Sequence, residues 1–96
     1  MTEELMAYLE EHPEYFYLVR NKHVVAIMSL LTEGGKSFDD LIAKSSLTKT
    51  KLKLLLDDLK KKKVITTMMT DSGQIYILDF NGQRILDLLE KAKEEG

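Results

Sequence analysis

Residues 37–65 read SFDDLIAKSSLTKTKLKLLLDDLKKKKVI, and the predicted fold depends most on this stretch. Its second half repeats leucine at positions i, i+3, i+4 and i+7, a spacing that puts side chains on one face of a helix. The leucines of this stripe are Leu52, Leu55, Leu56 and Leu59. The first half is shorter, with apolar side chains at Phe38, Leu41 and Ile42. The stretch therefore predicts two amphipathic helices joined by a polar turn.

Polar side chains mark where both helices begin. Ser37 is placed to cap the first helix, expected over Phe38 to Lys44, with Asp40 in a capping-box position. Thr48 is the N-cap that we expect for the second helix, Lys49 to Lys63. A short helix, a tight turn and a second helix with a buried stripe and a basic front end are the parts of a helix-turn-helix.

Composition bounds the class of protein. The chain has 96 residues, enough for one small domain, and its 44% hydrophobic and 31% charged content excludes wholesale disorder. The lack of cysteine excludes disulfides and thiolate metal sites. No apolar run approaches the roughly 20 residues of a membrane span, and Glu3 and Glu4 stand where a signal peptide would be basic. We expect an intracellular, cytoplasmic protein.

The net charge of −2 conceals a strong asymmetry along the chain. Residues 1–43 hold 3 basic and 8 acidic side chains, or −5. Residues 44–63 hold 8 lysines against 2 aspartates, or +6, and residues 64–96 hold 3 basic and 6 acidic side chains, or −3. A basic middle segment on an acidic body could steer a polyanion to one face of the molecule.

The segments before the helix-turn-helix also read as helices. Thr2 can cap a helix over Glu3 to Glu11, and Pro13 suits the first turn of a new helical segment. The apolar run of residues 15–19 either packs in the core or covers a subunit interface. A helix over Lys22 to Thr32 is apolar most of the way round, which places it at the centre of the domain.

The segments after the helix-turn-helix change character. Residues 64–70 are rich in β-branched side chains and residues 74–78 alternate, with turn residues between them, so we expect a β-hairpin. Asp79 or Asn81 can cap a last helix, expected over Gly82 to Glu95. The predicted fold class is mainly α with a small β-hairpin (α+β).

This order of elements resembles the winged helix-turn-helix fold of prokaryotic transcription regulators over about residues 20–90. The family closes its second motif helix with leucine, three residues and Gly-Leu-Ile, and here Leu59 is followed after three residues by Lys63-Val64-Ile65. The stretch Tyr76 to Gly82 is similar to the family's wing exit, "Tyr, any, Leu-Thr, two residues, Gly". Lys63 and Ser46 stand where the family usually has glycine, and Asp79 replaces its threonine.

The arsenical-resistance and multiple-antibiotic-resistance repressor families are the nearest likenesses. The resemblance implies one winged-helix domain over residues 1–96, with an N-terminal helical extension (1–20), a winged-helix core (21–80) and a C-terminal helix (81–96). Members usually dimerise through their terminal helices and place the second motif helix in the DNA major groove. The resemblance implies double-stranded DNA as partner and, as DNA contacts, Thr48, Lys49, Thr50, Lys51 and Lys53.

Electrostatics supports a DNA-binding transcriptional regulator. Lysines near the start of the second helix can neutralise phosphates and release counterions, and threonine hydroxyls can bond phosphates or base edges. No arginine lies in or near this helix, so the bidentate guanine contact is missing and we expect modest sequence specificity. The run Lys60 to Lys63 has a second interpretation, as a complement to the dipole at the helix end.

Other features favour a protein partner. With the leucine stripe facing inward, Leu54 and Asp57 point almost directly away from the core, and both suit a protein surface better than a phosphate backbone. The expected wing tip, residues 71–74, carries an acid and no base. The alternative function is therefore a winged-helix docking or assembly module that does not bind DNA.

The sequence offers no catalytic constellation. His12 and His23 are the only histidines and are far apart in sequence, so we expect no metal site. Adjacent acids such as Asp39-Asp40 and Asp57-Asp58 diverge by about 100° on a helix and cannot converge on one atom. With no spaced nucleophile and base and no phosphate loop, we expect neither an enzyme nor a cofactor.

The terminal segments carry more apolar side chains than one small core needs. The surplus consists of Leu5, Met6, Leu9, Tyr15, Tyr17, Leu86 and Leu89. We therefore expect a homodimer joined by the terminal helices, which would present two recognition helices about 34 Å apart to successive major grooves of a near-palindromic site.

Overall fold

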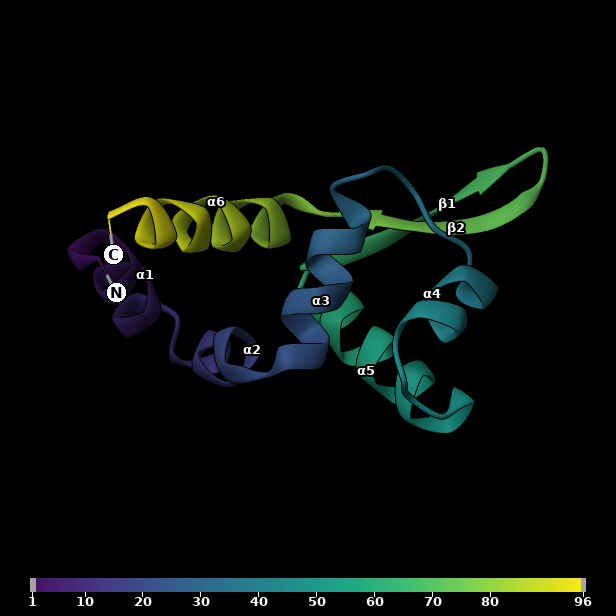
Figure 1. Cartoon of the computed structure of the whole chain (residues 1–96), viewed down its shortest axis with the longest axis horizontal. Coiled ribbons are helices and arrows are strands. Elements are labelled where there is room, and N and C mark those ends of the chain that lie inside the picture. Colours follow the sequence, from purple (N-terminus) through teal and green to yellow (C-terminus); the bar gives the residue numbers. More distant parts are fainter. Residues whose placement is uncertain (1, 96) are drawn as a thin grey trace.

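A computed structural model describes residues 2–95 of the chain; Met1 and Gly96 of the expected domain lie outside them. Helices form most of the fold, and a hairpin precedes the last of them (Figure 1). The elements are α1 (Glu3–Glu11), the 3₁₀ helix η1 (Pro13–Tyr15), α2 (Phe16–Arg20), α3 (Lys22–Leu31), α4 (Phe38–Lys44), α5 (Lys49–Lys61), β1 (Ile65–Thr70), β2 (Gly73–Leu78) and α6 (Phe80–Glu95). The molecule is elongated, 41 × 24 × 22 Å, with α1 and α6 at one end and α4, α5 and the hairpin tip at the other.

The helix starts follow the capping side chains. Thr2 Oγ1 accepts the N–H three residues on at 3.2 Å, and Thr48 does the same for α5 at 3.2 Å. Ser37 and Asp40 form the full capping box, because each side chain bonds the backbone N–H of the other residue. The predicted starts of α1, α4 and α5 are confirmed.

The end of α5 differs from the expectation of a helix running to Lys63. The helix ends at Lys61, and Lys63 has a left-handed backbone with φ of 59°. The Val64 N–H donates to the Leu59 carbonyl at 2.9 Å and the Lys63 N–H to the Lys60 carbonyl at 3.1 Å, which together are a Schellman motif. The burial of Val64 beside Leu59 stabilises this Schellman motif, after which the chain turns into β1.

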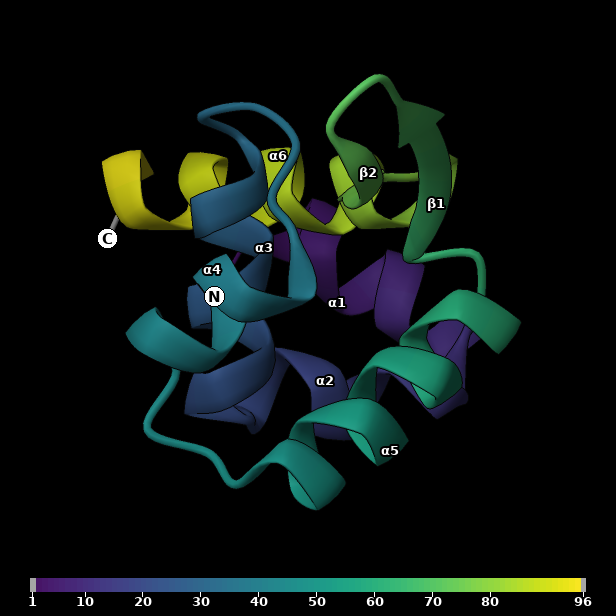
Figure 2. The same ribbon diagram turned by 90° about the vertical axis from the view of Figure 1, so that its right-hand side faces the viewer.

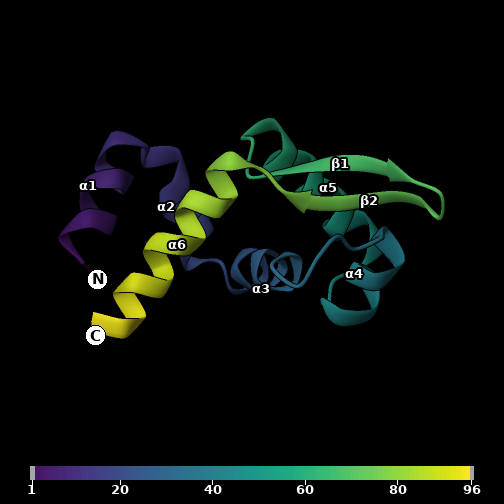
Figure 3. The same cartoon turned by 90° about the horizontal axis from the view of Figure 1, so that it is seen from above.

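The hairpin pairs β1 with β2 in antiparallel register, from Ile65 opposite Leu78 to Thr70 opposite Gly73. Its tip is tied by the Thr70 hydroxyl, which donates to the Gly73 carbonyl at 2.7 Å. Lys36 and Tyr76 exchange backbone hydrogen bonds of 3.1 and 2.7 Å, so the hairpin is anchored to the segment that leads into α4. Seen from above, the hairpin and α6 extend in opposite directions from the middle of the molecule (Figure 3).

The last helix starts at Phe80, two residues before the expected Gly82. Of the two candidate caps, Asp79 precedes the helix; its carboxylate accepts the Phe80 N–H at 2.7 Å. Asn81 lies within the helix, and its amide donates instead to the Tyr15 hydroxyl at 2.8 Å and to the Lys62 carbonyl at 3.0 Å. These two tertiary hydrogen bonds, which no local sequence pattern predicts, join α6 to η1 and to the end of α5.

A single core runs the length of the molecule. The α5 stripe is confirmed, with Leu52, Leu56 and Leu59 buried and Leu55 half-buried. The central position expected for α3 also holds, since this helix packs against α2, α6 and β2 and contributes four buried side chains to the core. None of the helices within residues 2–95 combines the length and apolar character that crossing a bilayer requires.

The expected apolar surplus on the terminal segments is largely used within the protomer. α1 packs against α6, and Leu5, Leu9, Tyr15 and Leu86 are all buried in the single chain. Of the rest, Leu89 is half-buried, and Met6 and Tyr17 are 37% and 43% exposed. The prediction of an unsatisfied terminal surface was therefore too broad, because it did not allow for the two ends of the chain packing on each other.

Candidate nucleic-acid interface

The candidate interface is the outward face of α5. Figures 1 and 2 place α5 along the lower edge of the molecule, on the side away from α6. Every side chain that the resemblance assigned to DNA contact is exposed there: Thr48, Lys49, Thr50, Lys51 and Lys53. The structure brings all of them together on the N-cap and first turns of one helix, but they do not share one face.

The buried stripe fixes which residues point outward. Residues at helical spacing on the opposite side of α5 are Thr50, Leu54, Asp57 and Lys61, and we call them the outer ridge. The same periodicity places Lys49 and Lys53 along one edge of this ridge and Lys51 along the other. An outer ridge between two cationic edges matches a helix lying in a groove between phosphate backbones.

Lys53 and Lys62 differ in how firmly their ammonium groups are held by other side chains. Lys53 Nζ lies 3.5 Å from the Asp57 carboxylate, but both side chains are more than half exposed, so this pair is weak and can exchange for a phosphate. Lys62 Nζ lies 2.6 Å from the Asp58 carboxylate and 5.3 Å from the centre of the Tyr17 ring. Lys62 is therefore committed to α2 and is withdrawn from the outward face.

The Tyr17, Asp58 and Lys62 side chains form one polar cluster. Burial alone would favour a neutral Asp58, but hydrogen bonds from Lys62 and from the Tyr17 hydroxyl outweigh it and lower the pKa of Asp58 below 3.8. The same bond to Asp58 raises the pKa of the Lys62 ammonium above 10.5. The cluster fastens the carboxyl-terminal half of α5 to α2.

Shallow hollows border the outer ridge on the hairpin side. One, of about 430 Å³, is lined by Phe38, Lys49, Thr50, Lys53 and Leu54. The next, of about 390 Å³, is lined by Phe38, Lys53, Gln74 and Tyr76. Phe38, one of the apolar side chains expected on the inner face of the first motif helix, is half-buried and lines both hollows.

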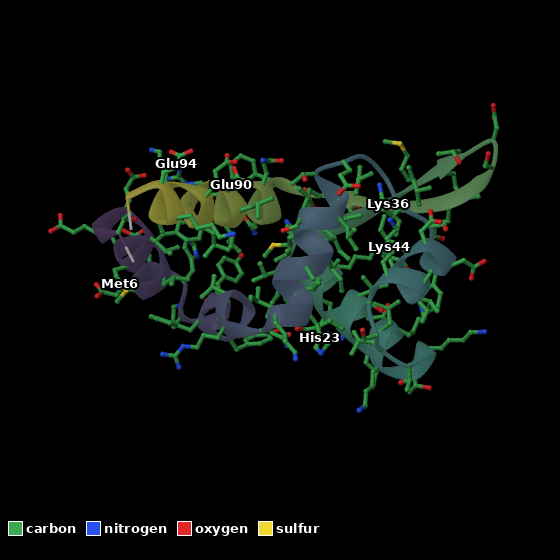
Figure 4. All side chains as sticks on the ribbon, in the orientation of Figure 1. Met6, His23, Lys36, Lys44, Glu90 and Glu94 are labelled. Carbon is green, nitrogen blue, oxygen red and sulfur yellow. The ribbon has the colours of Figure 1, made fainter. Side chains whose placement is uncertain are left out.

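Two further cations lie at the same end of the molecule. Figure 4 shows Lys36 and Lys44 around α4, whereas Glu90 and Glu94 lie on α6 at the other end. The exposed acids Asp39 and Asp40 begin α4, and the hairpin tip carries Asp71 and no base within residues 70–74. The positive character is therefore concentrated on α5 and beside it, rather than on the hairpin.

A separate groove lies among the terminal helices. It has a volume of about 370 Å³ and draws its lining from α1, α2, α3 and α6. The lining residues are Leu5, Val19, Val25, Ser29, Leu86, Leu89, Glu90, Ala92 and Lys93. Most of these are apolar, which makes this groove the part of the terminal surface that resembles an interface.

Neither histidine contributes to these surfaces. The His12 ring lies tilted against the Tyr8 ring at a centroid distance of 4.7 Å and stacks on the Tyr15 ring at 5.4 Å, and its Nδ1 lies 3.6 Å from Glu14. His23, labelled in Figure 4, lies in the first turn of α3, and its backbone N–H donates to the Asn21 side chain at 2.9 Å. Within residues 2–95 no group of three His, Asp or Glu side chains lies close enough together to hold a metal ion.

Comparison with solved structures finds the same overall fold in other proteins. The chain is similar to the M. tuberculosis protein Rv0081, with a TM-score of 0.74 and 22% identity over 91% of this chain and 86% of that one. It is also similar to the domain Mb0332 (fragment 1–100) from Mycobacterium bovis, with a TM-score of 0.73 and 17% identity over 99% of this chain and 89% of that one. The latter is described as a homodimeric winged helix-turn-helix DNA-binding domain of a possible ArsR-family transcriptional regulator.

No protein-family model and no curated protein matches the sequence. The likeness is therefore one of fold, and it extends over nearly the whole of this chain. The chain has a winged helix-turn-helix fold, with α4 and α5 as the motif and β1–β2 as the wing.

Proposed function

We propose that the chain is a homodimeric transcriptional regulator of the cytoplasm that places α5 in the major groove of duplex DNA. One observation carries the proposal: the amino half of α5 is exposed, is flanked by Lys49, Lys51 and Lys53, and is held rigidly by its buried leucines. A rigid helix with cations on both edges can bring its outer ridge to base edges while its lysines neutralise phosphates.

The homodimer is proposed through the terminal-helix groove. This groove is apolar and lies on a different part of the molecule from α5, so a second copy would leave both recognition helices free. The Mycobacterium bovis domain of the same fold is homodimeric, which supports this choice of partner. Two-fold symmetry would then set the two α5 helices about 34 Å apart, one turn of the duplex.

Changing Lys49, Lys51 and Lys53 together to glutamate tests the proposal. We expect wild-type binding to random-sequence duplex to weaken steeply with added salt, because each phosphate contact contributes about −0.9 to the slope of log affinity against log salt. The triple variant should bind at least roughly tenfold more weakly and show a smaller slope. Fluorescence anisotropy over a salt series measures both quantities, and circular dichroism checks the fold.

A matched control changes the same net charge elsewhere. Arg20, Arg84 and Lys91 are exposed on α2 and α6, away from the amino end of α5. Their triple change to glutamate should leave most of the affinity and the salt slope in place. Equal losses of duplex affinity in both triple variants would show that only overall charge matters. If the α5 changes leave duplex binding unaltered, the result would favour the docking module, in which Leu54 contacts a protein partner.

A further inference from the structure

Leu54 is the apolar member of the outer ridge and is 66% exposed. It lies one turn after Thr50 and just before Asp57, on the side of α5 opposite the buried Leu52 and Leu56. Single exposed leucines are ordinary on protein surfaces, so exposure alone means little. Its position matters instead, because it lies between the lysine edges that would face the two phosphate backbones.

The chemistry of the major groove restricts what Leu54 can face. Adenine, guanine and cytosine present hydrogen-bond donors and acceptors there, and a leucine set against them would desolvate those groups without replacing their bonds. Thymine alone presents an apolar group, its C5-methyl. We propose that Leu54 packs on a thymine methyl group and so selects thymine at one position of each half-site.

The absence of arginine from α5 gives this contact additional weight. Within the outer ridge only Thr50, Asp57 and Lys61 are polar, and none carries the planar guanidinium fork with which arginine reads guanine. Asp57 is engaged with Lys53 at 3.5 Å in the free protein. The hollow beside Leu54, bordered by Lys49 and Lys53, leaves its side chain open to an approaching base. Leu54 is thus a specificity-determining residue whose role rests on the proposed DNA binding.

Removing the methyl group without touching any hydrogen bond tests this inference. A duplex is selected from a random pool by the wild-type protein and then resynthesised with uracil in place of every thymine. Uracil keeps the thymine hydrogen-bond groups, so only methyl contacts are lost. We expect wild-type affinity to fall about fourfold for each methyl in contact, the equivalent of one buried methyl group. Leu54→Ala should bind both duplexes equally.

Phe80→Ala is the control variant, because Phe80 is a 79% exposed apolar side chain on another element. It should bind like wild type and show the full loss on uracil substitution. Wild-type binding that is indifferent to uracil overturns the thymine contact and leaves the DNA-binding proposal standing. If uracil substitution also weakens the binding of Leu54→Ala, the loss comes from another methyl contact or from a change in DNA shape. That result also overturns the proposed contact between Leu54 and thymine. A protein that binds no duplex at all overturns the proposed function and, with it, this inference.

Discussion

Lys63 adopts a left-handed backbone, with φ of 59°, immediately after α5. That conformation costs an L-residue roughly 1–2 kcal/mol and costs glycine little, although glycine also adds entropy to the unfolded chain. We expect Lys63→Gly to raise the free energy of unfolding by about 1 kcal/mol, because the Schellman close keeps its bonds. Urea unfolding should show a higher midpoint with an unchanged slope.

Lys53→Gly provides the contrast, since Lys53 is an exposed residue in the interior of the right-handed helix. It should destabilise the protein by about 1 kcal/mol. If both variants lose stability, the left-handed strain at Lys63 is too small to matter. Ser46, with φ of 54° in the motif turn, has the same left-handed conformation.

Asp58 links the stability of α5 to pH. Because hydrogen bonds hold the pKa of folded Asp58 below 3.8, its contribution is present above the unfolded pKa and is lost as pH falls through the folded value. Asp58→Asn should therefore cost about 1 kcal/mol or less at pH 7, since the carboxylate is partly exposed. The cost should be smaller at a second, acidic pH, because it is lost as pH falls from 3.8 through the folded pKa of Asp58.

Urea unfolding at both pH values measures the Asp58 effect. Asp57→Asn is the matched control, because the neighbouring Asp57 forms only an exposed pair with Lys53. Its effect should stay within about 0.5 kcal/mol at either pH. A penalty for Asp58→Asn that is undiminished in acid would mean that packing, and not charge, explains it.

At the scale of elements, Gly82 allows α6 to approach the backbone of Val64 closely. A Cβ at this position would overlap the Val64 carbonyl oxygen, which accepts the Asp79 N–H at 3.0 Å. We expect Gly82→Ala to destabilise by about 2 kcal/mol, because backbone must move to admit the methyl group. Thermal unfolding followed by circular dichroism measures the loss.

Gln83→Ala, one residue further along α6 and exposed, should change stability by no more than about 0.5 kcal/mol. Equal stability of Gly82→Ala and wild type would show that α6 can shift away from β1 without cost. The close approach also gives a physical reason for a glycine at the wing exit of this chain.

At the scale of the whole molecule, the terminal-helix groove should decide assembly. Leu89→Glu places a charge on the half-buried lining of this groove and should weaken the dimer by roughly tenfold or more. Duplex affinity should fall with it, because the second recognition helix is lost. Sedimentation velocity over a concentration series measures the dimer constant.

Two further variants keep the dimer test decisive. Ala92→Glu charges the same groove from a second half-buried position, in case Leu89→Glu does not fold. Gln83→Glu adds the same charge to an exposed position of α6 that does not line the groove and should leave the dimer intact. Folded groove variants that dimerise like wild type would place the interface elsewhere.

The local elements could be predicted because their causes are local. Capping side chains at Thr2, Ser37 and Thr48 and a leucine repeat act within a few residues, so the starts of three helices and the buried face of α5 follow from sequence. The end of α5 could not be predicted, because a lysine run carries no stop signal. The Schellman motif that ends α5 depends on the burial of Val64 by the rest of the fold.

The candidate DNA contacts and the division into residues 1–20, 21–80 and 81–96 remain predictions. Periodicity and charge are properties of consecutive residues, so the sequence predicts the helix pair and a basic α5 whose leucines face inward. The winged helix-turn-helix fold is predicted from the resemblance in the order of elements. Tertiary packing explains why the two ends of the chain bury each other's apolar side chains, why Lys62 turns to Asp58 and Tyr17, and why Leu54 stays open beside a cationic hollow. Those outcomes depend on contacts between residues far apart in the chain, which no local pattern encodes.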